Sequence, residues 1–225
     1  MRDLTPPPSS YDDTRTRVAH YFDATATRVW ERLTSDAPVS RIRQTVREGR
    51  DAMRALMLGQ LPTDLRGARV LDAGCGTGAA SAALAARGAH VTAIDISPKL
   101  VEIARARLPD GLGGQVDFRA GDMLASDLGR FDHVIAMDSL IYYTRPDLEA
   151  ALDNLAARAG SVVFTVAPRT PLLMAMWHAG QMMPRADRSP SMIPHDWRRM
   201  NVAGLSRVGR VSRGFYISEC LRVTA

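Results

Sequence analysis

The sequence is poor in cysteine and in long apolar runs, and each scarcity excludes a class of protein. Only two cysteines occur among 225 residues, so no disulfide framework is expected and a reducing compartment fits. No apolar run approaches the roughly 18 residues that a membrane-spanning helix needs. The N-terminal residues include three consecutive prolines and no apolar signal core, so we expect the protein to stay in the cytoplasm.

Basic residues exceed acidic ones, but they do not form a run. Lys and Arg total 29 against 24 Asp and Glu, giving a formal net charge of +5. A nucleic-acid-binding protein would gather this charge into a patch or stripe, whereas here the arginines are scattered among acids. We therefore expect no nucleic-acid partner. The mild excess favours a small anionic substrate or, at most, a peripheral contact with the inner membrane.

The chain divides into a disordered start, a helical segment and an α/β region. Residues 1–10 have little to bury, and apolar residues recur at helical spacing over 11–61, where Ser40 can cap a second helix. Residues 62–225 alternate strand and helix patterns, which predicts a mostly parallel sheet with helices on both faces. The expected strands are 69–73, 90–94, 115–120, 131–137 and 161–166, then a hairpin of 205–211 and 215–223; the expected helices are 79–87, 98–108 and 145–159.

A glycine-rich loop, V-L-D-A-G-C-G-T-G at 70–78, joins the first of these strands to a helix. Glycine removes side chains where a backbone must pass close to a ligand, and it permits positive φ. Dinucleotide-binding loops usually have the spacing G-x-G-x-x-G, whereas this loop has G-x-G-x-G with Asp72 at the strand end. An acid there suits an ammonium group and would repel a pyrophosphate. The loop therefore favours S-adenosylmethionine, a methyl donor with an amino-acid end.

The next two strands also end in acids. Asp95 is placed to accept hydrogen bonds from both ribose hydroxyls, and Ile96 to pack on the adenine. Asp122 can accept from the adenine amino group, and Met123 can cover the ring. The full set of expected cofactor-binding residues is Asp72, Ala73, Gly74, Gly76, Gly78, Asp95, Ile96, Asp122, Met123 and Met137.

These motifs resemble those of the class I S-adenosylmethionine-dependent methyltransferases. The resemblance implies a Rossmann-like α/β fold whose seven-stranded, mostly parallel sheet has an antiparallel last strand. Enzymes of this class that methylate exocyclic base amines carry Asp/Asn-Pro-Pro-Tyr/Phe after the fourth strand, and this chain has M-D-S-L at 137–140. Neither cysteine stands in the Pro-Cys setting of a cytosine-C5 enzyme. A small-molecule acceptor is therefore favoured.

Further motifs resemble the magnesium-protoporphyrin IX methyltransferases. They are Y-F-D-A-T-A at 21–26, L-I-Y-Y at 140–143, A-P-R-T-P at 167–171 and R-G-F-Y-I-S at 213–218. The segment 184–190 is most similar to the bacteriochlorophyll-pathway branch. The chain departs from several relatives at Tyr142, where they carry histidine, and at Arg50, where they often have Gly-His.

The resemblance implies that one propionate of magnesium protoporphyrin IX becomes a methyl ester, leaving S-adenosylhomocysteine (SAH). Tyr21 and Tyr142 are then the candidates for positioning the reacting carboxylate. Helices within 11–61 would form a lid, and 168–204 a substrate-binding insertion. Its expected substrate-binding residues are Arg169, Met174, Trp177, Arg185 and Arg188. No protein-bound metal is expected, and a magnesium chelatase subunit is a plausible partner.

Two other functions fit the same cofactor motifs. An O- or C-methyltransferase of another planar molecule, such as a quinone or a phenol, would share the cofactor residues and differ in the lid and in 168–204. A non-catalytic protein that binds S-adenosylmethionine would also keep Asp72, Asp95 and Asp122. The sequence leaves both alternatives open.

Overall fold

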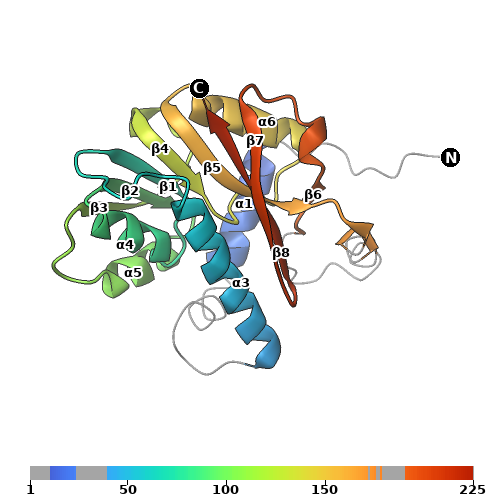
Figure 1. The fold of residues 1–225 in the computed structure, drawn as a ribbon, viewed down its shortest axis with the longest axis horizontal. Coiled ribbons are helices and arrows are strands. Elements are labelled where there is room, and N and C mark those ends of the chain that lie inside the picture. Colours follow the sequence, from blue (N-terminus) through green and yellow to red (C-terminus); the bar gives the residue numbers. More distant parts are fainter. Residues whose placement is uncertain (1–10, 24–39, 172, 176–177, 179–190, 225) are drawn as a thin grey trace.

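The computed structural model describes residues 11–23, 40–171, 173–175, 178 and 191–224, and its centre is a twisted β-sheet (Figure 1). The helices are α1 (Tyr11–Tyr21), α3 (Arg41–Leu58), α4 (Ala79–Ala86), α5 (Pro98–Arg107) and α6 (Arg145–Ala156), with short 3-10 turns η2 (Ser126–Leu128) and η3 (Trp197–Arg199). The strands are β1 (Arg69–Ala73), β2 (His90–Asp95), β3 (Gln115–Ala120), β4 (Phe131–Ala136), β5 (Ala159–Pro168), β6 (Pro194–His195), β7 (Leu205–Arg213) and β8 (Tyr216–Thr224).

The main path of the sheet runs β3-β2-β1-β4-β5-β8-β7. Strands β1 to β5 pair in parallel, whereas β8 is antiparallel to both β5 and β7. This arrangement confirms the expected mostly parallel sheet with a reversed last strand. A further two-residue strand, β6, pairs with the end of β5. The parallel order places the carboxyl ends of β1 to β5 along one edge, where ligands bind in folds of this kind.

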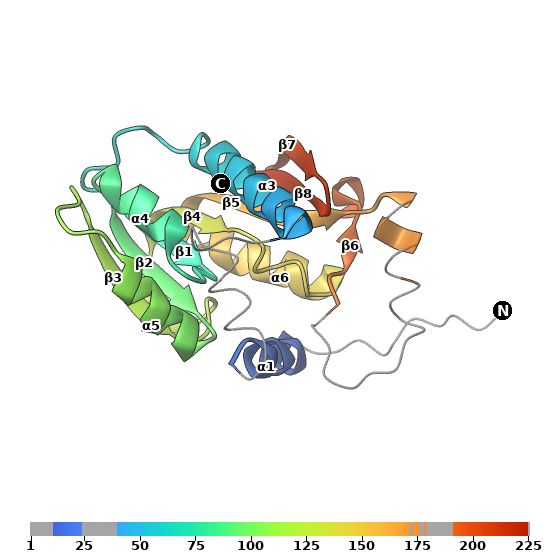
Figure 2. The same ribbon diagram turned by 90° about the horizontal axis from the view of Figure 1, so that it is seen from below.

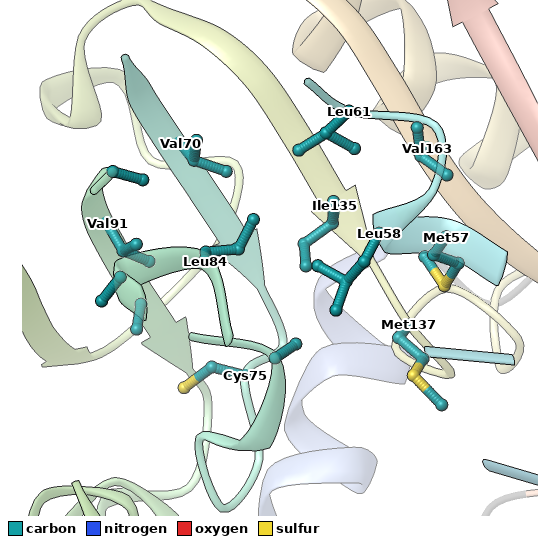
Figure 3. Close-up of a cluster of buried hydrophobic side chains, with 14 of the residues drawn as sticks. Met57, Leu58, Leu61, Val70, Cys75, Leu84, Val91, Ile135, Met137 and Val163 are labelled. Atoms are coloured by element: carbon teal, nitrogen blue, oxygen red, sulfur yellow. The ribbon is translucent and has the colours of Figure 1, made fainter. Parts of the chain in front are cut away.

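Two hydrophobic layers hold the helices to the sheet. On one face α3, α4 and α5 share a buried cluster with the strands, and Figure 3 shows Met57 and Leu58 of α3 near Ile135 and Val163 of the sheet. On the other face α6 packs through Leu148, Leu152 and Leu155. α1 lies across the sheet from α3 (Figure 2) and belongs to a small separate cluster. Among the described helices before β1, α3 is thus part of the core.

Most helix limits follow from local chemistry. Ser40 caps α3 by accepting from the Arg43 N–H at 3.4 Å, and Ser97 caps α5, where Pro98 takes the first helical position. The expected end of the 145–159 helix was wrong, because α6 ends at Ala156 and Gly160 lies inside β5. A Cβ on Gly160 would lie 3.1 Å from the Asp132 carbonyl oxygen, so the glycine serves close strand packing instead of ending a helix.

Among the described residues, no helix combines the length and the apolar composition that crossing a membrane would require.

The start of β3 passes very close to the start of β2, and this contact gives a testable prediction. A Cβ on Gly114 would lie 2.1 Å from the Ala89 carbonyl oxygen, whereas one on Gly113 would meet nothing nearer than 3.8 Å. Gly114→Ala should therefore lower the free energy of unfolding by about 1–3 kcal/mol or more, because two backbones must separate. Gly113→Ala is the matched control and should change it by less than about 0.5 kcal/mol. Urea unfolding followed by circular dichroism measures both, and equal losses would contradict the contact.

Candidate functional site

A cavity opens at the carboxyl ends of β1 to β4, between these strand ends and the helices α1 and α3. Eight of the ten expected cofactor-binding residues line it: Asp72, Gly74, Gly76, Asp95, Ile96, Asp122, Met123 and Met137. The structure does not bring Ala73 and Gly78 to the cavity wall. The Ala73 carbonyl accepts from the Ser139 hydroxyl at 2.7 Å, and Gly78 stands at the N-terminus of α4.

The three glycines of the loop have different environments, although all have positive φ. A Cβ on Gly74 would lie 2.3 Å from the Ser139 Cβ, so this glycine permits close approach of the loop after β4. A Cβ on Gly78 would press on Ala104 and Phe118. Gly76 has no neighbouring atom within 4 Å of its Cβ position, and it faces the cavity. Gly76 therefore supplies the bare backbone past which a ligand can lie.

Asp95 is held in place by two loops. Its carboxylate accepts from the Gly76 N–H at 2.8 Å and from the Ser97 N–H at 2.9 Å. Burial raises the pKa of the Asp95 carboxyl, although these two hydrogen bonds counteract the rise. The carboxylate is thus fixed in orientation at the cavity wall, where remaining lone pairs can accept from ligand hydroxyls.

Asp72 is a second buried acid in the same wall. It is 1% exposed and accepts from the Ser81 hydroxyl at 2.5 Å. Burial raises the pKa of Asp72 to about 6, and the nearby Asp95 charge adds to the rise. Two neighbouring acids in a desolvated pocket are costly when both are charged, and a cationic ligand would relieve that cost. The pair therefore suits a ligand that carries positive charge.

Asp122 is bound by α1, which the sequence did not suggest. Its two oxygens accept from the Tyr11 hydroxyl and the Arg15 guanidinium, each at 2.6 Å, and from the Leu124 N–H. Burial alone would raise the pKa of Asp122, but these hydrogen bonds lower it overall. Tyr11, Arg15, Val18 and Phe22 all line the cavity. Their spacing of four, three and four residues places them on one helix face, which was the available signal.

The other end of α1 is attached to the loop after β2. The Ser97 hydroxyl donates to the Asp23 carboxylate at 2.5 Å, and the Lys99 ammonium donates to the Asp23 carbonyl at 2.6 Å. The segment that begins with α1 is thus fastened at both ends across the ends of β2 and β3. It forms the wall of the cavity opposite the glycine loop.

The loop after β4 presents Asp138 to the cavity, a residue that sequence reasoning passed over. Among the described residues, Asp138 is the one non-glycine with positive φ (57°). Its carboxylate pairs with Arg50 of α3, and accepts from the Tyr216 hydroxyl at 3.1 and 3.3 Å and from the Thr165 hydroxyl at 3.1 Å. Strain of this kind persists only where the surroundings impose it, and functional sites collect it.

The two expected catalytic tyrosines differ in position. Tyr142 is buried and lines the cavity, and burial followed by the Asp138 charge raises the pKa of its hydroxyl. At neutral pH the Tyr142 hydroxyl is therefore protonated and can donate a hydrogen bond. Tyr21 is half-buried, packs edge-on against Phe22 and is absent from the described lining of the cavity.

Of the five expected substrate-binding residues, the structure describes two, Arg169 and Met174. Arg169 is exposed and Met174 half-buried, and neither lines the cavity, while Trp177, Arg185 and Arg188 lie outside the described residues. Four other arginines line the cavity instead: Arg15, Arg47, Arg50 and Arg54. Three of these stand on α3 at spacings of three and four, a pattern that the sequence contained.

The described residues show no group of three or more His, Cys, Asp or Glu side chains that could hold a metal ion. Both cysteines are buried and free. Burial raises the pKa of the Cys220 thiol to about 12, and burial with the Asp72 and Asp95 charges raises that of Cys75. Neither thiol is in its reactive, ionised form at neutral pH.

Comparison with known proteins extends over nearly the whole chain. Residues 136–225 match the model of the magnesium-protoporphyrin IX methyltransferase C-terminus, and 70–159 match that of a methyltransferase domain. The magnesium-protoporphyrin O-methyltransferase of Rhodobacter capsulatus is 58% identical over 219 residues, covering 95% of this chain and 98% of that protein. The protein of the same name from Synechocystis is 32% identical, covering 93% and 95%.

A solved structure agrees. The crystal structure of magnesium protoporphyrin IX methyltransferase from Synechocystis PCC 6803 with bound SAH superposes with a TM-score of 0.76. Its sequence is 29% identical to this chain, and the match covers 93% of this chain and 99% of that one.

The raised pKa of Asp72 gives a prediction in which stability and binding move in opposite directions. The folded-state pKa of about 6 exceeds the ordinary value of 3.8, so Asp72 destabilises the ligand-free fold increasingly as pH rises from about 3.8 to about 6, and fully above pH 6. Asp72→Asn should raise the free energy of unfolding at pH 7.5 by about 1–3 kcal/mol, or several degrees in Tm. It should also abolish most of the thermal stabilisation that SAH gives.

Thermal unfolding at pH 7.5 and 5.5, with and without SAH, measures both effects. In the unsubstituted protein, the ligand-free form should gain stability from Asp72 as pH falls towards 5.5, and the variant should lose that gain. The exposed Asp127→Asn is the control and should change neither quantity. An Asp72→Asn variant that keeps its full response to SAH would remove Asp72 from the binding site.

Proposed function

This chain belongs to the magnesium-protoporphyrin O-methyltransferase family, and we propose that it methylates a propionate carboxylate of magnesium protoporphyrin IX with S-adenosylmethionine as donor. The product is the monomethyl ester, an intermediate of bacteriochlorophyll biosynthesis. The observation that carries this conclusion is that the relationship runs from the N-terminal helices to the closing hairpin. A protein sharing only the cofactor-binding half would not show it.

The order of acids along the sheet edge gives the cavity a direction. Asp122 follows β3, Asp95 is the last residue of β2 and Asp72 is the last but one of β1, while Asp138 follows β4. S-adenosylmethionine, when bound, supplies a methyl group on a positively charged sulfur. With Asp95 at the ribose and Asp72 at the ammonium group, the acceptor end of the cavity lies next in line, at Met137 and Asp138. The acids thus suit the donor, whose ammonium and sulfonium groups both carry positive charge.

A carboxylate acceptor needs little acid–base help. Its pKa of about 4–5 leaves it ionised at neutral pH, so no strong base is required. The remaining work is to orient one carboxylate oxygen and to exclude water. Tyr142 can orient it by donating a hydrogen bond, and Phe22, Met123 and Met137 provide apolar wall around the reacting atoms.

The same wall disfavours a quinol or phenol acceptor. Such a hydroxyl has a pKa near 10 and reacts faster with a base beside it. The described lining residues include no histidine, and Asp138 is already paired with Arg50 and Tyr216. A porphyrin carboxylate therefore suits the site better. The remaining alternative is a protein that binds S-adenosylmethionine without transferring its methyl group, and an activity assay distinguishes it from both enzymes.

Two finer proposals concern how an apolar substrate reaches the site. Delivery could come from a magnesium chelatase subunit or from a membrane surface on which the protein rests peripherally. Ile42 at the start of α3 and Phe215 at the tip of the β7–β8 hairpin are large exposed apolar residues. The hairpin tip meets the first part of α3, since a Cβ on Gly214 would lie 2.3 Å from the Thr45 hydroxyl. Exposed apolar side chains flanked by arginines, as here, suit an anionic apolar surface.

One assay tests the proposal and these two extensions. Purified protein with radiolabelled S-adenosylmethionine should place label in a methyl ester of magnesium protoporphyrin IX, and none in a quinol supplied in parallel. Label in the quinol would support the alternative acceptor, and SAH-site binding without any transfer would support the non-catalytic reading. Supplying the porphyrin on a chelatase subunit, or on anionic vesicles, should raise kcat/KM above that for free porphyrin. Unchanged values would dismiss the corresponding route.

The two tyrosines can be ranked by conservative substitution. Tyr142→Phe removes a buried donor at the acceptor end, so kcat/KM should fall about tenfold, the value of one hydrogen bond. Tyr21→Phe should cost less, because Tyr21 does not line the described cavity. Affinity for SAH, measured by calorimetry, should stay unchanged in both variants. A larger loss for Tyr21→Phe would reverse their proposed roles.

A further inference from the structure

We propose that the face of α3 bearing Arg47, Arg50 and Arg54 is the carboxylate-binding edge of the acceptor cavity, and that Arg47 and Arg54 bind the propionate that is not methylated. This inference rests on the proposed function and adds a substrate subsite to it. It places that subsite on α3 instead of the 168–204 segment that the sequence suggested.

The three arginines form one row. Spacings of three and four residues place them on the same face of the helix, and all three line the cavity. The helix is fixed at this point, because a Cβ on the neighbouring Gly49 would lie 2.7–2.9 Å from the Tyr216 ring. Glycine thus lets α3 rest directly on β8, and the row is presented by a rigid element of the core.

Charge divides the cavity into two ends. Among the described lining residues, the three acids Asp72, Asp95 and Asp122 at the cofactor end stand against one arginine, Arg15. At the α3 end, the described arginines outnumber the acids Asp51 and Asp138. A cationic donor and a dianionic acceptor would each meet the complementary end.

The ion pairs of Arg50 and Arg54 differ in burial, so these two arginines are given different roles. The pair of Arg50 with Asp138 is well covered, with side-chain exposures of 19% and 9%, and breaking it would strand a nearly buried charge. Arg50 is therefore anchored, and it acts as a positioning residue beside the reacting carboxylate. With its charge compensated by Asp138, it does not overstabilise the attacking oxygen.

Arg54 is different. Its partner Asp51 is 54% exposed, and pairs of that kind contribute little. An incoming carboxylate can therefore displace Asp51 at small cost. Together with Arg47, about two turns away, Arg54 can hold a second carboxylate at the helix, at a distance from the reacting one that the porphyrin sets.

Two porphyrin esters test the subsite without relying on turnover. Magnesium protoporphyrin IX monomethyl ester keeps the non-reacting propionate, and the dimethyl ester lacks it. Titration of each into SAH-loaded protein, followed by porphyrin fluorescence, should show the monomethyl ester binding more tightly. Arg47→Ala and Arg54→Ala should each weaken it about 5- to 20-fold and leave dimethyl ester affinity unchanged, because each removes a charged donor. Arg54→Lys should retain part of the preference.

The matched control is Arg43→Ala, an exposed arginine on the same helix that does not line the cavity, and it should bind both esters as the unsubstituted protein does. Unchanged affinity for SAH verifies that each variant is folded. Equal binding of the two esters by the unsubstituted protein, or equal losses for both esters in the variants, would overturn the subsite. That failure would be distinct from failure of the proposed function, which shows as an absence of methyl transfer in the unsubstituted protein.

Discussion

The buried carboxylate of Asp95 holds together the two loops on which the rest of the site depends. Asp95 accepts from Gly76 in the loop after β1 and from Ser97 at the start of α5, so two loops share one acceptor. The carbonyl of Ile94 beside it accepts from Gly74 and Cys75. The glycine loop therefore cannot move independently of β2. This coupling keeps the loop backbone facing the cavity, although burial makes the charged acid costly.

The charges around the cavity follow from the arrangement of the strands and helices that form its walls. Because the strands are parallel, the acids at the carboxyl ends of β1, β2 and β3 lie along the same edge, and the cavity is negative there. α3 closes the far side with arginines, while α1 covers the near side by bonding Asp122 and Ser97. The described helices of the N-terminal region therefore form different walls of the cavity. α3 is packed firmly in the core and bears a row of arginines, whereas α1 is attached through hydrogen bonds and a small apolar cluster.

The sequence predicted the parts of this site that depend on local pattern. Short apolar runs located β1 to β5 within a few residues, and the glycine loop with Asp72 and Asp95 predicted residues that line the cavity. Residues whose role depends on where a distant helix packs escaped prediction. The sequence placed Tyr11 and Arg15 only in a helical segment. Asp138 was considered only as part of M-D-S-L, which lacks the two prolines of the base-amine methyltransferases. Its pairing with Arg50 across 88 positions leaves no local signal. Arg169 was predicted from its motif, but the chain after β5 leaves it exposed.

Gly160 shows how a reasonable local rule can fail. Glycine commonly ends helices, yet here the neighbouring β4 backbone required a residue without a side chain inside a strand. Spatial neighbours, absent from any local window, decided its role.

The state of the two thiols has a practical consequence for watching this protein work. Cys75 and Cys220 are both buried and both protonated at neutral pH, so alkylating reagents will find little to react with. A cysteine introduced on the outer surface of α1, with another on α5, would therefore take up a spectroscopic probe selectively in the otherwise unaltered chain. Because the two natural thiols react little, the distance between probes on α1 and α5 can be measured without first replacing either natural cysteine.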